Sequence, residues 1–348
     1  MGKINFMCDY AEGAHPAILD ALVKTNMEQT VGYGLDGYCD TARARIKAAC
    51  DMPGADVHFL VGGTQTNTTV IAALLRPYQG VISGDAGHIA VHETGAIEGT
   101  GHKVLCLPSE NGKIKVDDVS ACLEAHFTSE IAEHTVMPGM VYLTYPTECG
   151  TLYSKAELTE IRALCRRYEI PLFIDGARLG YGLTSPACDL TLPELARLCD
   201  VFYIGGTKCG CYFGEAVVIT NDAYKKGFRY MIKRQGGLFA KGRLLGIQFA
   251  TLFENDLYFN ICAHAVTEAL RIRAAFAARG VEFFGASMTN QQFPILKKAQ
   301  RAYFEENYLP EFWCDAADGK EVVRFCTSWA TKTENVDALI EDIKKMPQ

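Results

Sequence analysis

Short apolar runs alternate with amphipathic stretches through the middle of the chain, between about residues 57 and 220. The runs are rich in Val, Ile, Leu, Phe and Tyr without strict alternation, a pattern typical of strands that are covered on both faces. Seven strands are predicted, in VHFLVGG, GVISGD, HKVLCLP, GMVYLTYP, PLFIDG, VFYIGG and YFGEAVVIT. Because strands alternate with helices, the pattern predicts an α/β fold with a mainly parallel sheet and helices on both faces.

The helical pattern is clearest in KAELTEIRALCRRYE, residues 155–169. Leu158, Ile161, Leu164 and Cys165 fall on one stripe of a helix drawn over this segment. We therefore expect an amphipathic helix that packs one face against the sheet.

The pattern changes after about residue 250. Helical periodicity over 244–279 leads out of the sheet region, and short strands (VEFFG, QQFPIL, EVVRFCTSW) then mix with helices (KKAQRAYFEEN, NVDALIEDIKKM). We expect an N-terminal segment over 1–50 with a helix and a glycine-tyrosine loop, a large α/β domain over 51–250 and a small C-terminal α+β domain over 251–348.

Length, composition and charge narrow the class of protein. A chain of 348 residues can build two cores, and its 49% hydrophobic and 22% charged residues are ordinary for a soluble globular protein. The 34 basic and 41 acidic residues form no long runs, which argues against a nucleic-acid partner. No stretch is apolar enough for a membrane helix, and MGKINFMCDY lacks the features of a signal peptide, so we expect a cytoplasmic protein without a membrane partner.

The fourteen cysteines are scattered and lack the spacing of a disulfide framework. Cys209 and Cys211 form the one close pair, and no second pair completes a zinc site. We expect reduced thiols and no metal.

Two of the predicted strands deliver polar side chains at their ends. Asp175 follows the strand in PLFIDG, and Lys208 follows the strand in VFYIGG. Ligands of open α/β sheets bind outside the carboxyl ends of the strands, so both side chains are expected at one site. Gly205 and Gly206 before the lysine let a flat ligand approach the backbone, and a dry pocket would lower the pKa of the lysine and free its amine to attack a carbonyl. The structural alternative is that Asp175 caps a helix and Lys208 is a solvated loop residue.

A third element fits the same site. VGGTQTN runs from a strand through two glycines into a helix, so the N–H groups of Gly63, Thr64 and Gln65 would form an anion cradle. The segment is neither a Walker A loop nor a G-x-G-x-x-G motif, and such a turn can be purely structural. An anion cradle, a carboxylate and an amine together match pyridoxal 5′-phosphate, with the phosphate on the helix, the ring nitrogen facing Asp175 and the aldehyde on Lys208.

With these residues the chain resembles the threonine aldolase/β-eliminating lyase family of fold type I pyridoxal-phosphate enzymes, in its low-specificity L-threonine aldolase-like branch. GGTQTN, GHIAVHETGA, FIDGARL and the dipeptide Thr207–Lys208 carry the resemblance, which runs from about residue 5 to 345. It implies that Lys208 holds the cofactor, that Asp175 keeps its ring nitrogen protonated, and that His88 stacks on the ring and helps to manage the substrate hydroxyl proton.

The resemblance also implies a set of binding residues. For the cofactor they are Gly63, Thr64, Gln65, His88, Asp175, Arg178, Thr207, Lys208 and Lys241. For the substrate they are Cys8, Tyr33, His134, Arg178 and Arg324. Arg178 and Arg324 would hold the substrate carboxylate from two domains. Tyr33 and Lys241 match positions that reach a neighbouring subunit's site, so a homodimer or homotetramer with shared active sites is expected.

The chain departs from the family pattern at the substrate end. Many members begin with R-S-D-T, whereas this chain has Met7, Cys8, Asp9 and Tyr10, and a thiol is a weaker donor than a serine hydroxyl. Glu148 in YPTECG stands where many members have a histidine, and His134 matches a loop histidine only loosely.

We interpret the sequence as a pyridoxal-phosphate lyase that cleaves the Cα–Cβ bond of a β-hydroxy amino acid, L-threonine or L-allo-threonine, to glycine and an aldehyde. Two alternatives stay open at this point. One is β-elimination or racemisation of another amino acid with the same cofactor. The other is a non-catalytic binding protein that retains the fold.

Overall fold

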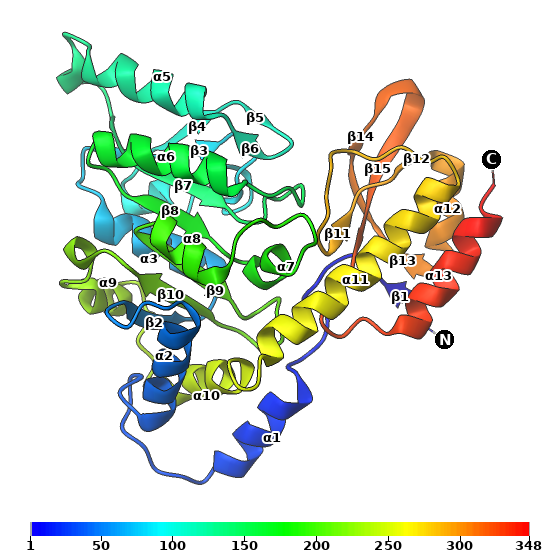
Figure 1. Ribbon diagram of the computed structural model, residues 1–348, viewed down its shortest axis with the longest axis horizontal. Helices are drawn as coiled ribbons and strands as arrows, with labels where there is room; N and C mark the ends of the chain where they lie inside the picture. The colour runs from blue at the N-terminus through cyan, green and yellow to red at the C-terminus, as the bar shows by residue number, and fades with distance from the viewer. Residues whose placement is uncertain (1, 348) are drawn as a thin grey trace.

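The computed structural model describes residues 2–347, which form a large lobe and a smaller one (Figure 1). The long helix α11 (Leu257–Ala278) runs from the large lobe along the smaller one. Among residues 2–347 we find no helix whose length and apolar character would let it cross a membrane.

A seven-stranded sheet forms the centre of the large lobe. The seven predicted strands are confirmed, and they lie in the order β2-β10-β9-β8-β7-β3-β4. Their bounds are β2 (Asp56–Leu60), β3 (Gln79–Gly84), β4 (Val104–Leu107), β7 (Met137–Thr144), β8 (Leu172–Asp175), β9 (Val201–Gly205) and β10 (Glu215–Ile219). Only β10 runs against its neighbours, so the other six strands end at the same edge of the sheet.

Helices cover both faces of this sheet, as expected. Alternate side chains of each strand belong to different cores: in β9, Phe202 and Ile204 face one core, and Val201 and Tyr203 face the other. Helices α2 (Gly37–Ala49), α5 (Val116–Phe127), α6 (Lys155–Arg167), α8 (Leu192–Leu198) and α10 (Arg243–Leu252) contribute to the first core. Helices α3 (Gly63–Leu74), α4 (His88–Val91) and α9 (Phe228–Arg234) contribute to the second.

The predicted helix over 155–169 is confirmed as α6, and its start is encoded locally. The Ser154 hydroxyl accepts a bond from the N–H of Glu157, whose carboxylate accepts from the N–H of Ser154 in return. The helical periodicity over 244–279 is divided between α10 and α11, because Asn255 and Asp256 adopt left-handed backbone angles, with φ of 52° and 57°.

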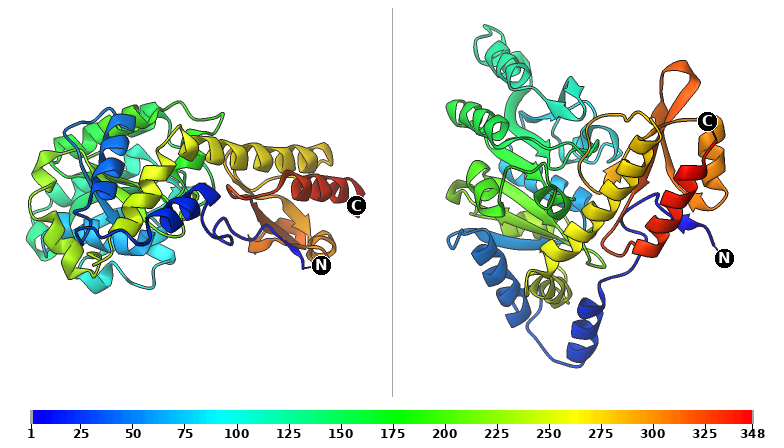
Figure 2. Two further views of the ribbon diagram at one scale, coloured as in Figure 1. Left: turned by 90° about the horizontal axis from the view of Figure 1, so that it is seen from below. Right: turned by 45° about the vertical axis from the view of Figure 1, so that its right-hand side comes forward.

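The small lobe is built on β15 (Lys320–Cys326), which pairs with β11 (Gln291–Gln292), β12 (Ile295–Lys297) and β14 (Glu311–Asp315). Helices α11 and α13 (Thr333–Lys345) lie side by side along this sheet (Figure 2), and α12 (Lys298–Glu305) follows β12 directly. A third core joins these elements.

Two features of the small lobe differ from the expectation. The predicted strand VEFFG makes only an isolated bridge between Phe283 and Pro294, and β14 was not predicted. The chain also begins in this lobe, because β1 (Ile4–Asn5) pairs with β13 (Tyr308–Leu309) and Phe6 lies in the third core. The domain limits at residues 50 and 250 stay predictions.

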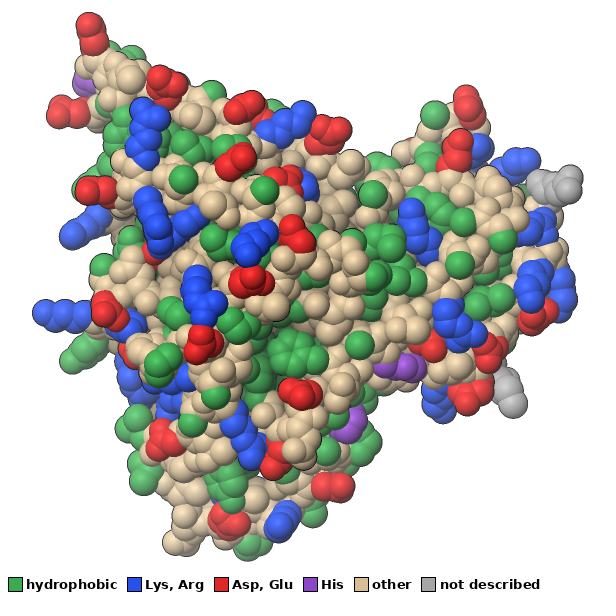
Figure 3. Space-filling view, in the orientation of Figure 1, with side chains coloured by type: hydrophobic (Ala, Val, Ile, Leu, Met, Phe, Trp, Pro, Cys, Tyr) green, Lys and Arg blue, Asp and Glu red, His purple; other side chains and the backbone are tan. Residues whose placement is uncertain are grey.

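The N-terminal segment then crosses to the large lobe. Helix α1 (Pro16–Thr25), which confirms the predicted N-terminal helix, and the loop after it pack near α10 (Figure 1). Figure 3 shows side chains of both charges interspersed over this face of the molecule, with hydrophobic side chains among them at the lower end.

Candidate active site

Two adjoining cavities lie at the edge where the parallel strands end. The inner cavity has a volume of about 170 Å³ and is lined by Gly63, Thr64, Asp175 and Thr207, among others. The outer cavity, about 250 Å³, opens toward the small lobe and is lined by residues that include Arg324. His88, Glu148, Arg178 and Lys208 line both cavities, so the two form one candidate site.

Asp175, the last residue of β8, is held by four donors. Oδ2 accepts from the Tyr142 hydroxyl at 2.5 Å and from Asn67 Nδ2 at 3.1 Å. Oδ1 accepts from the Tyr203 hydroxyl and from the N–H of Ala177 at 3.0 Å. Because the donors come from two strands, a helix and a turn, the carboxylate has a fixed orientation in the inner cavity.

His88 begins α4 and is tied to the same network. Its Nδ1 lies 2.7 Å from Glu93 Oε1, and Asn67 donates to that oxygen at 2.8 Å as well as to Asp175. Burial alone would lower the pKa of His88, but the bond to Glu93 and the charge of Asp175 outweigh it and raise the pKa. The imidazole is therefore positioned through Nδ1, which leaves Nε2 for a ligand.

The first turn of α3 presents unbonded N–H groups to the inner cavity. Gly62, at the N-cap, has no side chain that could accept, and within residues 2–347 no acceptor bonds the N–H of Gly63, Thr64 or Gln65. The Gln65 side chain fixes this turn by accepting from the N–H of Val61 at 3.2 Å and donating to the carbonyl of Gln235 at 3.1 Å. The arrangement is an anion site of the helix N-terminal kind.

Lys208 follows β9 on a tight turn. A Cβ atom on Gly205 would lie 2.3 Å from the carbonyl oxygen of Ala177, so only glycine allows the turns after β8 and β9 to approach this closely. Removal from water and the charge of Arg178 lower the pKa of Lys208, although Asp9 and Asp175 oppose this shift. The amine is thus biased toward its neutral, nucleophilic form.

Arg178 is already paired with a carboxylate of this chain. Its Nε and Nη2 donate to the two oxygens of Asp9 at 2.7 and 3.0 Å, and Asn290 Nδ2 donates to the same carboxylate at 2.9 Å. Burial alone would raise the pKa of Asp9, but Arg178 and Lys208 lower it to about 2. Only Nη1 of Arg178 is without a bond to another residue in the described part of the chain.

Arg324 reaches the outer cavity from β15. Its Nη1 donates to Gln291 Oε1 at 2.9 Å, its Nη2 donates to the Met7 carbonyl at 2.8 Å, and the same Nη2 forms an ion pair with Glu311. The guanidinium carbon lies 5.4 Å from the ring centre of Trp313. Glu311 and Trp313 belong to β14, the strand that the sequence did not reveal.

Five of the predicted site residues line neither cavity, and one of them is Gln65 in the first turn of α3. Tyr33 lines a separate cleft with Phe239, and Lys241 is exposed nearby. His134 is exposed in a short 3-10 helix (Ala132–His134), so its position gives no support to a substrate contact. Cys8 lies between Met7 and Asp9 without facing either cavity.

The sequence model of the β-eliminating lyase family matches residues 5–318 of the chain. The chain belongs to that family. It is 44% identical to a threonine aldolase of Leishmania major whose structure superposes with a TM-score of 0.95, covering 98% of this chain and 99% of that one. It is 28% identical over 344 residues to the low specificity L-threonine aldolase of Pseudomonas aeruginosa, covering 97% of this chain and 96% of the relative. The structure of mouse CSAD, 12% identical with a TM-score of 0.75 and coverage of 99% and 84%, shares the fold alone.

Family membership makes the protein a lyase of the fold type I architecture and speaks against a purely non-catalytic role. Several groups that organise this lyase site were not predicted. Asn67 and Glu93 lie inside the motifs GGTQTN and GHIAVHETGA and could have been noticed there. Tyr142 and Tyr203 lie in apolar strands, where a tyrosine is indistinguishable by pattern from a core residue.

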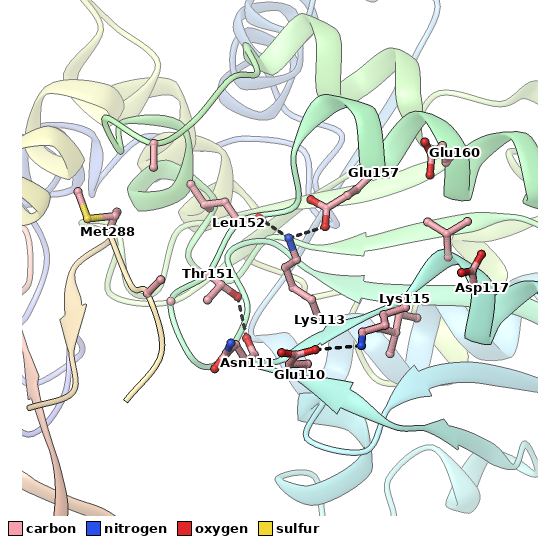
Figure 4. A pocket seen from close by; sticks show the side chains of 15 residues that line it. Glu110, Asn111, Lys113, Lys115, Asp117, Thr151, Leu152, Glu157, Glu160 and Met288 are labelled. Atoms are coloured by element: carbon pink, nitrogen blue, oxygen red, sulfur yellow. Dashed lines mark hydrogen bonds and ion pairs between the residues drawn. The ribbon is translucent and has the colours of Figure 1, made fainter. Parts of the chain in front are cut away.

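A third cavity, about 640 Å³, shares no lining residue with the two cavities of the candidate site, and Figure 4 shows the side chains that line it. It is bounded by the hairpin around Lys113, the start of α6 and Met288 of the small lobe. Lys113 there forms an ion pair with Glu157 at 2.5 Å and donates to the Leu152 carbonyl. None of the predicted site residues lines it.

Proposed function

We propose that the protein is a pyridoxal 5′-phosphate-dependent aldehyde-lyase that cleaves L-threonine or L-allo-threonine to glycine and acetaldehyde. The observation that carries this proposal is the meeting of Lys208, Asp175 and the free N-terminus of α3 in one cavity. The relatives named threonine aldolase, at 44% and 28% identity, support the same reaction.

The residues of the inner cavity fit the cofactor. The unbonded N–H groups of α3 suit its phosphate, and Asp175 suits a protonated ring nitrogen. The lowered pKa of Lys208 favours a neutral amine, which suits the aldehyde of the cofactor. His88 and Thr207 line the same cavity. When bound, the cofactor supplies an electron sink for the electron pair of the breaking Cα–Cβ bond.

The substrate carboxylate is assigned to the outer cavity. Arg324 lines this cavity and is paired with Glu311, so a substrate carboxylate can replace Glu311 and keep an ion pair with the guanidinium. Arg178 adds Nη1 from the other side while Asp9 holds the rest of its guanidinium. Binding between the lobes orients the substrate and excludes water from it.

The β-hydroxyl proton is assigned to His88 and Glu148. Glu148 Oε1 accepts from the backbone N–H of His88 at 2.8 Å, and Oε2 accepts from the Thr144 hydroxyl at 3.0 Å. Burial raises the pKa of Glu148, which makes its carboxylate a better acceptor for the hydroxyl proton. As the Cα–Cβ bond breaks, the hydroxyl loses its proton to this pair and becomes the aldehyde, and Cα gains a proton before glycine leaves.

The direct test is product analysis with L-threonine and L-allo-threonine. The purified protein with added pyridoxal phosphate should release glycine and acetaldehyde in equal amounts, and Lys208→Ala should abolish release. Borohydride reduction should attach the cofactor to the peptide that contains Lys208. Pyruvate and ammonia from a β-substituted amino acid, without glycine from either threonine, would instead favour the β-elimination alternative.

We also propose that two copies of the chain associate through the N-terminal segment. Large apolar side chains are exposed on α1 and the loop after it, including Val23 at 70% and Met27 at 88% of their surface, and Tyr33 and Phe239 continue this surface. Such a surface next to the predicted partner-facing residues Tyr33 and Lys241 suits a second copy. The cytoplasmic location expected from the sequence stays a prediction.

A further inference from the structure

Glu215, the first residue of β10, is a buried carboxyl group that the reaction above does not use. Because β10 runs against its neighbours, its first residue lies at the edge where β9 ends, and Glu215 is in register with Gly205. Its side chain therefore lines the inner cavity together with Lys208.

The contacts of Glu215 hold the turn that carries the lysine. Oε1 accepts from the Thr207 hydroxyl at 2.8 Å, and Oε2 lies 3.2 Å from the N–H of Gly206. That N–H is shared, since it also donates to the Gly214 carbonyl at 2.9 Å. The Thr207 oxygen accepts in turn from the N–H of Gly214 at 3.0 Å. The carboxylate of Glu215 thus accepts one full hydrogen bond, from Thr207, and shares a second donor, the N–H of Gly206, with the Gly214 carbonyl.

Three carboxyl groups act on Lys208, and they differ in how well their negative charge is stabilised. Asp9 has a two-point contact with Arg178 and a bond from Asn290. Asp175 has four donors. Glu215 has the fewest, and burial raises its pKa even though Thr207 and Lys208 oppose the shift. Of the three carboxylates, Glu215 is therefore the one that takes up a proton most readily.

We propose that Glu215 is a positioning residue that sets the protonation state of the Lys208 amine from across the inner cavity. Within residues 2–347 no hydrogen bond or ion pair joins the two side chains, so the carboxylate acts on Nζ through its charge. An ionised Glu215 favours the ammonium form of Lys208, and a protonated Glu215 favours the neutral amine. The inference rests on the proposed function for the role of Lys208.

Other titratable and charged groups of the site also face Glu215 or Lys208. Asp175 and the hydroxyl of Tyr203 face Glu215 from β8 and β9, and Cys211 faces it from the loop before β10. Arg178 acts on Lys208 from the turn after β8 and disfavours a second positive charge. These neighbours are the same in each variant below, so a change can be assigned to Glu215.

The test is the variant Glu215→Gln, which keeps the side-chain length and an acceptor for Thr207 but cannot carry a negative charge. The pH midpoint of the visible absorbance of the bound cofactor is measured between pH 6 and 10. In parallel, the full chain without cofactor is treated with an amine-reactive reagent over the same pH range, and labelling of the Lys208 peptide is followed by mass spectrometry.

Loss of the carboxylate should move both midpoints to lower pH, because Glu215 raises the pKa of Lys208. An unchanged or higher labelling midpoint would overturn the proposal. Glu268→Gln is the matched control, since Glu268 is buried in the small lobe and paired with Arg271, and it should leave the Lys208 midpoint in place.

If Glu215→Gln does not fold, Thr207→Val provides the second variant. It removes the donor to Oε1, so the carboxylate is less stable and the labelling midpoint of Lys208 should again fall; no fall would contradict the proposal. Labelling reads the lysine itself. If the labelling midpoint shifts but the protein does not cleave threonine, the result would count against the proposed function and not against the role of Glu215.

Discussion

At the scale of single residues, the site is defined by which hydrogen bonds are already made. Asp175 accepts from four donors, which fix the orientation of its carboxylate. Arg324 differs because its partner Glu311 is 38% exposed and can turn away. Arg324, which we assign to the substrate carboxylate, can therefore release Glu311 and bind the substrate in its place.

The variant Glu311→Gln tests this exchange. Without the competing carboxylate, Arg324 should bind the substrate carboxylate more tightly, so KM for threonine should fall several-fold while kcat changes little. Arg324→Ala should raise KM by roughly tenfold to a hundredfold, as expected for loss of a charged hydrogen bond of about 1.5–3 kcal/mol. Steady-state kinetics on both threonine isomers measures the two effects. A higher KM in Glu311→Gln would show that Glu311 positions Arg324 instead of competing for it.

At the scale of elements, the start of α3 is the part of the fold that makes an anion site. Its first turn is fixed from outside the helix, because Gln65 reaches the carbonyl of Gln235 just after α9. The orientation of the N–H groups thus depends on the packing of one helix end against another.

The variant Gln65→Ala should loosen this turn, because it removes both hydrogen bonds of the Gln65 side chain. Binding of pyridoxal phosphate should weaken by up to about tenfold, the scale expected for the loss of one or two hydrogen bonds. At saturating cofactor, kcat should stay close to that of the parent. Absorbance titration of cofactor-free protein measures the affinity. Thr68→Ala is the control on the same helix, because the Thr68 hydroxyl bonds only to carbonyls of its own helix. Equal affinities for both variants would contradict the role of Gln65.

At the scale of the whole molecule, Asp9 connects three parts of the chain. It comes from the N-terminal segment, Arg178 from the large lobe and Asn290 from the small lobe. The Asp9 side chain is fully buried and that of Arg178 is nearly so, so removal of either partner leaves a buried charge without a counter-charge.

Asp9→Asn should lower the free energy of unfolding by about 3–5 kcal/mol at pH 7, the range for breaking a buried pair. The pKa of Asp9 is lowered from 3.8 to about 2, so its stabilisation is present above pH 4 and is lost as the pH falls toward 2. The difference between variant and parent should therefore shrink over that window in denaturant unfolding. Asp40→Asn, which breaks the exposed pair with Arg43, should cost less than about 1 kcal/mol. A pH-independent loss in Asp9→Asn would point to packing and not to charge.

Association of two copies is tested by mixing inactive variants. If Tyr33 of one subunit serves the site of the other, Lys208→Ala chains mixed with inactive Tyr33→Ala chains should regain part of the activity through hybrid sites. Sedimentation or light scattering must show that both variants form the parent oligomer. Hybrids that assemble but stay inactive would rule out the shared site.

Much of this architecture could be predicted from the sequence because its signals are local. Apolar runs predict the seven strands, and the stripe in residues 155–169 predicts α6. The glycines before Lys208 and at the start of α3, together with the motifs of the family, predict that Lys208, Asp175 and Gly63 meet at one edge of the sheet. Parallel strands end at the same edge, so strand identity alone brings these residues together.

Other features follow only from the tertiary structure. The reversed direction of β10 brings Glu215 to the lysine, and in the sequence that strand looks like the parallel ones. The pairing of β14 with β15 sets Glu311 against Arg324, although β14 is weakly patterned. Asp9 meets Arg178 and Asn290 from segments far apart in the chain. Local sequence determines which strands and helices form, because that depends on near neighbours. Which charges meet, and hence how each one titrates, depends on contacts across the whole chain, and these exist only once the lobes have packed.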